Sequence, residues 1–203
     1  MATATLIDRE SAPQADELVA VDEFGDPCEV VDGQAVEGSS MGAWEGCVAT
    51  TIAFLLNQFV REKRLGRVAG EVLFILKKEP RLHRKPDVAF VSAERSAAMR
   101  PTARTAAWDV IPDLAIEVVS PTDPAGAVQA KIVEYFAAGV RLVWIVYPDQ
   151  CQVYVYESPR VVRVLGWEDT VDGGSVLPGF TMALAEVFEA EVDEAPPARS
   201  DEP

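Results

Sequence analysis

The sequence is poor in the residues that build the commonest metal and redox sites. Its only histidine is His83, which excludes histidine-rich metal centres. The three cysteines, Cys28, Cys47 and Cys151, are far apart and form no C-x-x-C pair, so neither a zinc site nor a disulfide framework is indicated. Since cysteine is among the most frequently buried residue types, all three are expected to be buried thiols.

Long apolar runs are also lacking. No stretch reaches the roughly 18 apolar residues that a membrane-spanning helix needs, and the start MATATLIDRE has neither the basic nor the apolar region of a signal peptide. We therefore expect a cytoplasmic protein without membrane contact. The 203 residues suit one domain over residues 23–189. The acidic residues 1–22 and the acidic, proline-rich residues 190–203 are expected to be disordered tails.

Basic residues are scarce, and the net charge of −15 argues at first against nucleic acid as a ligand. Their distribution is uneven, however. Residues 61–104 hold twelve Lys or Arg against five Asp or Glu, a net charge of +7, which leaves −22 for the remainder. One interpretation is a local basic surface, with Arg81, Arg84 and Lys85 as candidate nucleic-acid-binding residues. The other is a set of scattered, solvated charges.

The hydrophobic pattern predicts an α/β fold, a mixed β-sheet flanked by α-helices with an N-terminal β-hairpin. The hairpin spans residues 28–36 and turns at Asp32-Gly33. Helices are expected at 43–65, with Gly66 as its stop, and at 125–138. The second helix makes a right-handed crossover between parallel strands. Strands are expected at residues 71–76, 86–91, 113–119, 141–147 and 152–157, and residues 167–188 should add a short strand and a helical turn around LPGF.

One acid interrupts the apolar strand 113–119. An ionised carboxylate such as that of Glu117 costs several kcal/mol to bury unless it is compensated. Because side chains alternate along a strand, Glu117 shares a face with Ala115, as Asp87 does with Ala89 in strand 86–91. If these strands are neighbours, the two carboxylates can meet. A divalent cation, a basic side chain or a raised pKa would then compensate the charge. The alternatives are a turn-binding role for Asp87 and a structural salt bridge for Glu117.

Three segments in order resemble a known family. RKPDVAFVSAER, PDLAIEVVSPTD and KIVEYFAAGVRLVWIVYP are similar to the Uma family of restriction endonucleases, a branch of the PD-(D/E)xK nuclease superfamily, over about residues 28–188. The resemblance implies a restriction-endonuclease-like core and DNA as the substrate. It also implies Mg²⁺ or Mn²⁺ held by Asp87, from the PD motif, and by Glu117, from the (D/E)xK motif. Such a metal polarises the scissile phosphate and activates a water molecule.

The lysine of the (D/E)xK motif is missing, because residue 119 is Val119. Lys131 is the candidate substitute: it flanks the apolar stripe of the predicted helix 125–138, so its long stem can carry the ammonium group to the strand ends. The resembling family also has a lysine in this helix. The alternative is a rim lysine that pairs structurally with Glu134 or Glu117. Glu71, at a predicted strand start, is a further candidate acid.

Other interpretations stay open at this point. Glu45 lies where some nucleases of the superfamily place an acid, although a solvated or capping role is the alternative. Residues 38–42 fit the G-x-S-x-G pattern of a serine hydrolase with Ser40 as nucleophile, but only His83 could serve as its base. A flexible turn explains these residues as well.

The rival to an enzyme is a nuclease-fold protein without cleavage, which acts as a nucleic-acid-binding or assembly module. The missing lysine and the acidic composition favour it. Apolar strand edges and the aromatic hairpin with Tyr154 and Tyr156 predict a homodimer.

Overall fold

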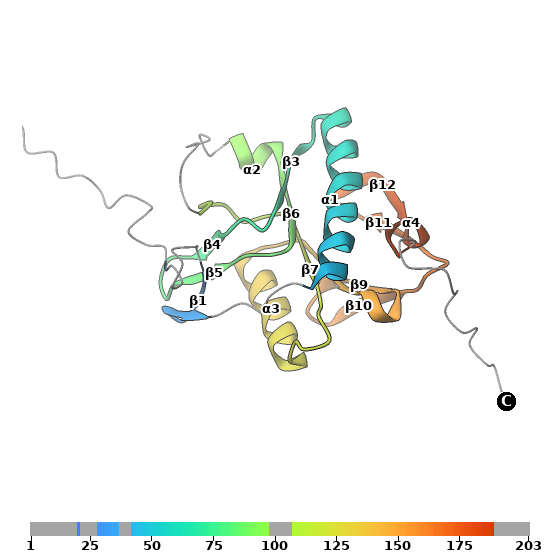
Figure 1. Ribbon diagram of the computed structural model, residues 1–203. Helices are drawn as coiled ribbons and strands as arrows, with labels where there is room; N and C mark the ends of the chain where they lie inside the picture. The colour runs from blue at the N-terminus through green and yellow to red at the C-terminus, as the bar shows by residue number, and fades with distance from the viewer. Residues whose placement is uncertain (1–19, 21–27, 37–41, 98–106, 189–203) are drawn as a thin grey trace, which may run out of the picture.

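A computed structural model describes residues 20, 28–36, 42–97 and 107–188 of the chain (Figure 1). Apart from Ala20, the two predicted tails lie outside these residues, and so does Ser40 of the G-x-S-x-G motif. Within them, no helix is both long and apolar enough to cross a bilayer.

The centre of the fold is a mixed sheet with the strand order β10-β9-β8-β7-β6-β3. Strands β7 and β8 are parallel, and the crossover between them is the helix α3 (Ala125–Ala138), so the predicted parallel pair is confirmed. All residues of β7 are buried, as expected for a strand covered on both faces. The strand bounds are β3 (Gly66–Gly70), β6 (Val88–Ser92), β7 (Leu114–Val118), β8 (Leu142–Tyr147), β9 (Gln152–Ser158) and β10 (Val161–Leu165).

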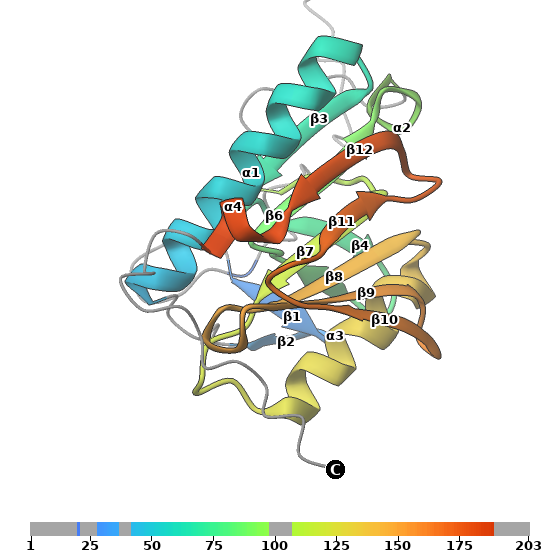
Figure 2. The same cartoon turned by 90° about the vertical axis from the view of Figure 1, so that its right-hand side faces the viewer.

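One face of this sheet is covered by the helix α1 (Ala43–Lys63), the short helix α4 (Leu184–Phe188) and the hairpin of β11 (Thr170–Gly173) and β12 (Leu177–Ala183) (Figures 1 and 2). The apolar side of α1 is built by a residue at every fourth position, which keeps all of them on one side of the helix. These residues are fully buried in the larger core: Val48, Ile52, Leu56 and Val60.

The other face carries α3 and a second sheet with the order β2-β1-β5-β4. Its strands are β1 (Glu29–Val31), β2 (Gln34–Val36), β4 (Phe74–Lys77) and β5 (Leu82–Arg84). Strands β1 and β2 form the predicted hairpin, with positive φ angles of 50° at Asp32 and 79° at Gly33. A smaller core between these layers includes Phe74, Ile132 and Tyr135. The second sheet and α3 therefore lie on the face of the central sheet that is opposite to the larger core.

Two predicted boundaries around α1 and the following strands are wrong. The helix ends at Lys63, and Arg64 caps it with a left-handed φ of 55°, whereas Gly66 already belongs to β3. The apolar run 71–76 is not one strand either, because Glu71, at a φ of 49°, lies in the bend between β3 and β4. Strand β3 escaped prediction because its sequence GRVAG has few β-branched or aromatic residues.

The C-terminal part holds more strands than the pattern predicted. LPGF lies in β12 rather than in a helical turn, and the turn of helix comes later, in α4. The pattern also missed strands β10 and β11 in this part. Earlier in the chain it missed strand β5 and the short helix α2 (Ala93–Ala97). The chain turns between β8 and β9 through the short 3-10 helix η2 (Pro148–Gln150).

The expectation of three buried thiols is wrong. Cys47 is exposed on α1, and Cys28 and Cys151 are half-buried. No disulfide bond joins the three cysteines, all of which lie in the described part of the chain.

Candidate active site

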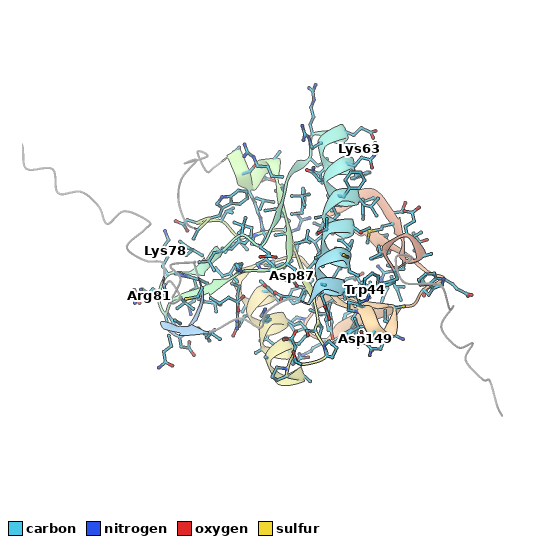
Figure 3. The ribbon with its side chains drawn as sticks, viewed as in Figure 1. Trp44, Lys63, Lys78, Arg81, Asp87 and Asp149 are labelled. Carbon is cyan, nitrogen blue, oxygen red and sulfur yellow. The ribbon has the colours of Figure 1, made fainter. Side chains whose placement is uncertain are left out.

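Asp87 and Glu117 come together because β6 and β7 are antiparallel neighbours. Val88 lies opposite Ile116, which places Asp87, the residue before β6, opposite Glu117. The Asp87 Oδ2 atom accepts a hydrogen bond of 2.6 Å from the Val118 backbone N–H. In Figure 3, Asp87 lies beside the N-terminal half of α1. The structure thus shows that the strands of the two acids are neighbours, which the alternation pattern had left open.

The proximity of the two acids changes the protonation of Asp87. Burial, and then the Glu117 carboxylate, raise the pKa of Asp87 to about 7. The Val118 N–H and the Lys131 ammonium act in the opposite direction but do not offset this effect. Near neutral pH the Asp87 carboxyl group is therefore poised between its neutral and charged forms.

Glu117 is compensated from α3. Lys131 Nζ donates to Glu117 Oε2 at 2.7 Å, and the Tyr135 hydroxyl donates to Oε1 at 2.5 Å. The two donors are four residues apart, so they project from the same side of the helix. Burial still raises the pKa of Glu117, although Lys131 lowers it. Lys131 thus reaches the strand where the nuclease motif would have its lysine.

A second buried ion-pair network, which the sequence analysis missed, adjoins this pair. Glu29 Oε2 accepts from Arg84 Nη1 at 2.7 Å, and Oε1 accepts from the Lys85 backbone N–H at 2.8 Å. Arg84 also binds Glu134, with 2.7 Å from Nε and 2.6 Å from Nη2 to Oε2. Lys131 Nζ lies 3.7 Å from Glu29 Oε1, which connects the network to Glu117. The only sign of this network in the sequence was Glu29 itself, an acid directly before the two valines of a short strand.

The carboxylates of this network raise the pKa values of its two cations, Lys131 and Arg84. Burial lowers the pKa of Lys131, but the carboxylates of Glu117 and Glu29 outweigh burial, so the pKa is raised. The same holds for Arg84, where burial is outweighed by Glu29 and Glu134. Both side chains are therefore positively charged at neutral pH.

This arrangement corrects the interpretation of Arg84. Its guanidinium group is only 7% exposed and is committed to two carboxylates, so it does not lie on a surface that a phosphate could reach. Arg81 and Lys85 are half-buried, and Lys77 and Lys78 nearby are exposed. In Figure 3, Lys78 and Arg81 lie far from Lys63, with Asp87 between them. The basic residues therefore form two separate groups rather than one patch.

A cavity of about 690 Å³ opens next to Asp87. One wall is the small-residue side of α1, and the other is formed by Gly70, Glu71 and Asp87. Glu71 thus shares the cavity with Asp87, although it lies in a bend rather than at a strand start. Glu45 does not line this cavity; it is 7% exposed, so the solvated alternative for it is wrong.

His83 does not have the surroundings of a catalytic base. It is 1% exposed in β5, between Val30 of β1 and Ile75 of β4. Burial, and then Arg81, lower its pKa. Among the described residues its Nδ1 atom has no hydrogen-bond partner.

The donor set fits a hard divalent cation in part. Within the described ranges, no three His, Cys, Asp or Glu side chains converge as a ligand group. Two carboxylates do face each other across β6 and β7, and the Val118 N–H binds the Oδ2 atom of Asp87. Each oxygen of Glu117 accepts one hydrogen bond, and an ionised carboxylate has about four acceptor sites. Since Mg²⁺ is commonly bound by one or two carboxylates with water and phosphate oxygens, a pair of acids such as Asp87 and Glu117 matches the protein ligands that this ion uses.

Comparisons with known proteins agree with this fold. The family model Uma2, described as "Putative restriction endonuclease", matches residues 14–185. A crystal structure of a putative nuclease of the DUF820 family from Anabaena variabilis is similar with a TM-score of 0.72 and 18% sequence identity, covering 84% of this chain and 93% of that one. At this identity the similarity shows the fold alone. No curated protein matches the chain.

Proposed function

The chain belongs to the Uma2 family, and on this premise we propose that it is a metal-dependent endonuclease that hydrolyses DNA phosphodiester bonds. One observation carries the proposal: Asp87 and Glu117 face each other across β6 and β7 while Lys131 contacts Glu117. Two acids and a lysine at one strand pair are the groups that this chemistry needs.

Each residue has a distinct part. Asp87 and Glu117 would hold Mg²⁺ or Mn²⁺, which polarises the scissile phosphate and lowers the pKa of the attacking water. Lys131 supplies the positive charge that Val119 cannot. Tyr135 fixes the orientation of Glu117 by its hydrogen bond to Oε1. Glu71, at the cavity wall, is an auxiliary acid. A metal ligand must be deprotonated, so Asp87, with a pKa of about 7, would have to release its proton to water in order to hold the ion.

The DNA backbone would be held by basic side chains outside this buried network. Lys and Arg neutralise phosphates. Lys77 ends β4, Lys78 and Arg81 follow in the turn to β5, and Lys85 comes just after β5. Arg84 has a structural part in this proposal. DNA as the substrate agrees with the cytoplasmic location expected from the sequence.

A second candidate function, an assembly module without cleavage, is favoured by the edge strand β10. Val161, Val162 and Val164 are 52%, 42% and 50% exposed there. Val162 and Val164 lie opposite Tyr156 and Tyr154 of β9, which extends the apolar surface. An apolar edge strand readily pairs with another chain, so a second copy could join here as a homodimer.

Cleavage of supercoiled plasmid DNA with Mg²⁺ or Mn²⁺ tests the first candidate. Asp87→Asn and Glu117→Gln should each lower the rate by about 10²-fold or more and abolish Mn²⁺ binding in calorimetry. Asp149→Asn, which changes an exposed acid in η2 (Figure 3), should match the wild type. A wild type that cleaves with neither metal, but sediments as a dimer that Val162→Lys dissociates, would establish the module instead.

A further inference from the structure

The ammonium group of Lys131 lies between two carboxylates that come from different sheets. Glu117 Oε2, on β7 of the central sheet, is 2.7 Å from Nζ. Glu29 Oε1, on β1 of the second sheet, is 3.7 Å from the same atom. The first contact is a short hydrogen bond, and the second is a longer ion pair.

Glu29 is held far more firmly than Lys131. Its side chain is 8% exposed, and its two oxygens bind Arg84 Nη1 and the Lys85 N–H. Arg84 is anchored in turn to Glu134, which lies on α3 close to Lys131. The Lys131 side chain itself is 25% exposed and has four rotatable carbons. A fixed anion thus stands beside a lysine that could otherwise turn toward water.

The carboxylates of Glu117 and Glu29 bind different partners besides Lys131. In the proposed reaction Glu117 serves both Lys131 and the divalent cation, which are both positively charged and repel each other. Glu29 has no part in the cation site, because its oxygens bind Arg84 and Lys85. Glu29 therefore provides Lys131 with a carboxylate that does not also bind the divalent cation.

We propose that Glu29 is a positioning residue that keeps the Lys131 ammonium group beside Glu117. The N-terminal hairpin is then part of the active site rather than an appendage of the fold. The consequence for catalysis rests on the proposed nuclease function, whereas the holding of Lys131 by Glu29 does not.

Solvent exchange of the Lys131 ammonium protons, measured by NMR and assigned by their loss in Lys131→Met, tests the contact without metal or DNA. Glu29→Gln should speed this exchange by about fivefold or more, because a partly buried ion pair no longer holds the group. The matched control is Asp172→Asn, which also removes a carboxylate from an arginine, Arg163, but has no ion pair with Lys131 among the described residues. Its exchange should equal that of the wild type. Glu29→Asp keeps the charge with a shorter reach and should be intermediate, which provides a second variant if Glu29→Gln folds poorly.

Cleavage kinetics test the consequence. Glu29→Gln should lower kcat by about 10-fold with little change in KM, and Asp172→Asn should leave kcat unchanged. In a Lys131→Met background, Glu29→Gln should cause no further loss, because two residues that act through one contact are not additive.

The outcomes separate the two proposals. Equal exchange in the wild type, Glu29→Gln and Glu29→Asp overturns the positioning role, whether or not the protein cleaves DNA. An additive loss of kcat in the Lys131→Met background overturns it as well. Faster exchange in Glu29→Gln, in a protein whose wild type cleaves no DNA, supports the positioning role and refutes the nuclease function instead.

Discussion

Asp87 and Glu117 face each other but are compensated very differently. Glu117 receives an ammonium and a phenol hydroxyl from α3, whereas Asp87 receives one backbone N–H. The excess negative charge of the pair therefore falls on Asp87, whose pKa rises to about 7. Another buried acid, Asp113, shows the opposite case, since Arg95, Arg141 and the Ser92 N–H all bind it.

This difference predicts how stability depends on pH. Folded Asp87 keeps its proton up to about pH 7, whereas the unfolded residue loses it near the ordinary aspartate pKa of 3.8. Between these values the folded state binds more protons, so stability falls as the pH rises. Asp87→Asn stays neutral and can still accept the Val118 N–H. In EDTA at pH 8 it should raise the free energy of unfolding by about 2–4 kcal/mol, at ~1.36 kcal/mol per pKa unit.

Urea denaturation checks this prediction. The gain from Asp87→Asn should be smaller at pH 5 than at pH 8 and should vanish below the unfolded pKa. Asp113→Asn is the matched control and should instead destabilise the protein, because its charge is paired with two arginines. A variant at Asp87 that is less stable than the wild type at pH 8 would contradict the raised pKa.

At the scale of elements, Arg84 ties three of them together. It lies at the end of β5 and binds Glu29 of β1 and Glu134 of α3. Arg163 of β10 also pairs with two carboxylates, those of Glu157 and Asp172, at 3.8 and 3.0 Å. Its side chain, however, is 42% exposed. Each arginine thus pairs with two carboxylates, but the Arg84 group is buried and the Arg163 group is exposed to solvent.

Removal of the buried arginine should be far more costly than removal of the exposed one. Arg84→Ala leaves two buried carboxylates without a cation and should lower the free energy of unfolding by about 3–5 kcal/mol. Arg163→Ala should lower it by about 1 kcal/mol or less, because exposed ion pairs are weak. Urea denaturation of both variants measures the difference. Equal losses would mean that Arg84 is hydrated in solution.

At the scale of the whole molecule, the positive charge is divided. Arg61, Lys63, Arg64 and Arg67 lie at the C-terminal end of α1 and in β3, whereas Lys77, Lys78 and Arg81 lie around the turn between β4 and β5. Lys78 is paired with Asp109 at 2.7 Å, which leaves Lys77 and Arg81 as the cations of that turn without an ion pair among the described residues. The second group is the one we assign to DNA.

The salt dependence of DNA binding tests this assignment. Joint replacement of Lys77 and Arg81 by Ala should reduce the slope of log affinity against log salt by about 2, at roughly 0.9 per lost phosphate contact. The control, Arg61→Ala with Arg64→Ala, removes the same charge from the other group and should leave the slope unchanged. A larger effect of the control would transfer the DNA-binding surface to the end of α1.

The local pattern of the sequence determined much of this protein. Hydrophobic periodicity identified α1, and alternation placed Asp87 and Glu117 each on one face of its own strand. The strand–helix–strand spacing predicted that β7 and β8 are parallel. These features depend on residues that are close in the chain and on backbone geometry that every strand or helix shares. The angular position of Lys131 on its helix followed in the same way.

Only the tertiary structure decided which charges meet. Glu29 and Arg84 are 55 residues apart, and Arg84 and Glu134 are 50 apart, so no local pattern relates them. Arg84 looks like any surface arginine in the sequence, and it is buried because β5 is inserted between β1 and β4. Glu71 reaches the cavity because the chain bends where an apolar run suggested a strand. Pairing between distant strands sets these contacts, and it depends on how whole layers pack rather than on the residues nearby.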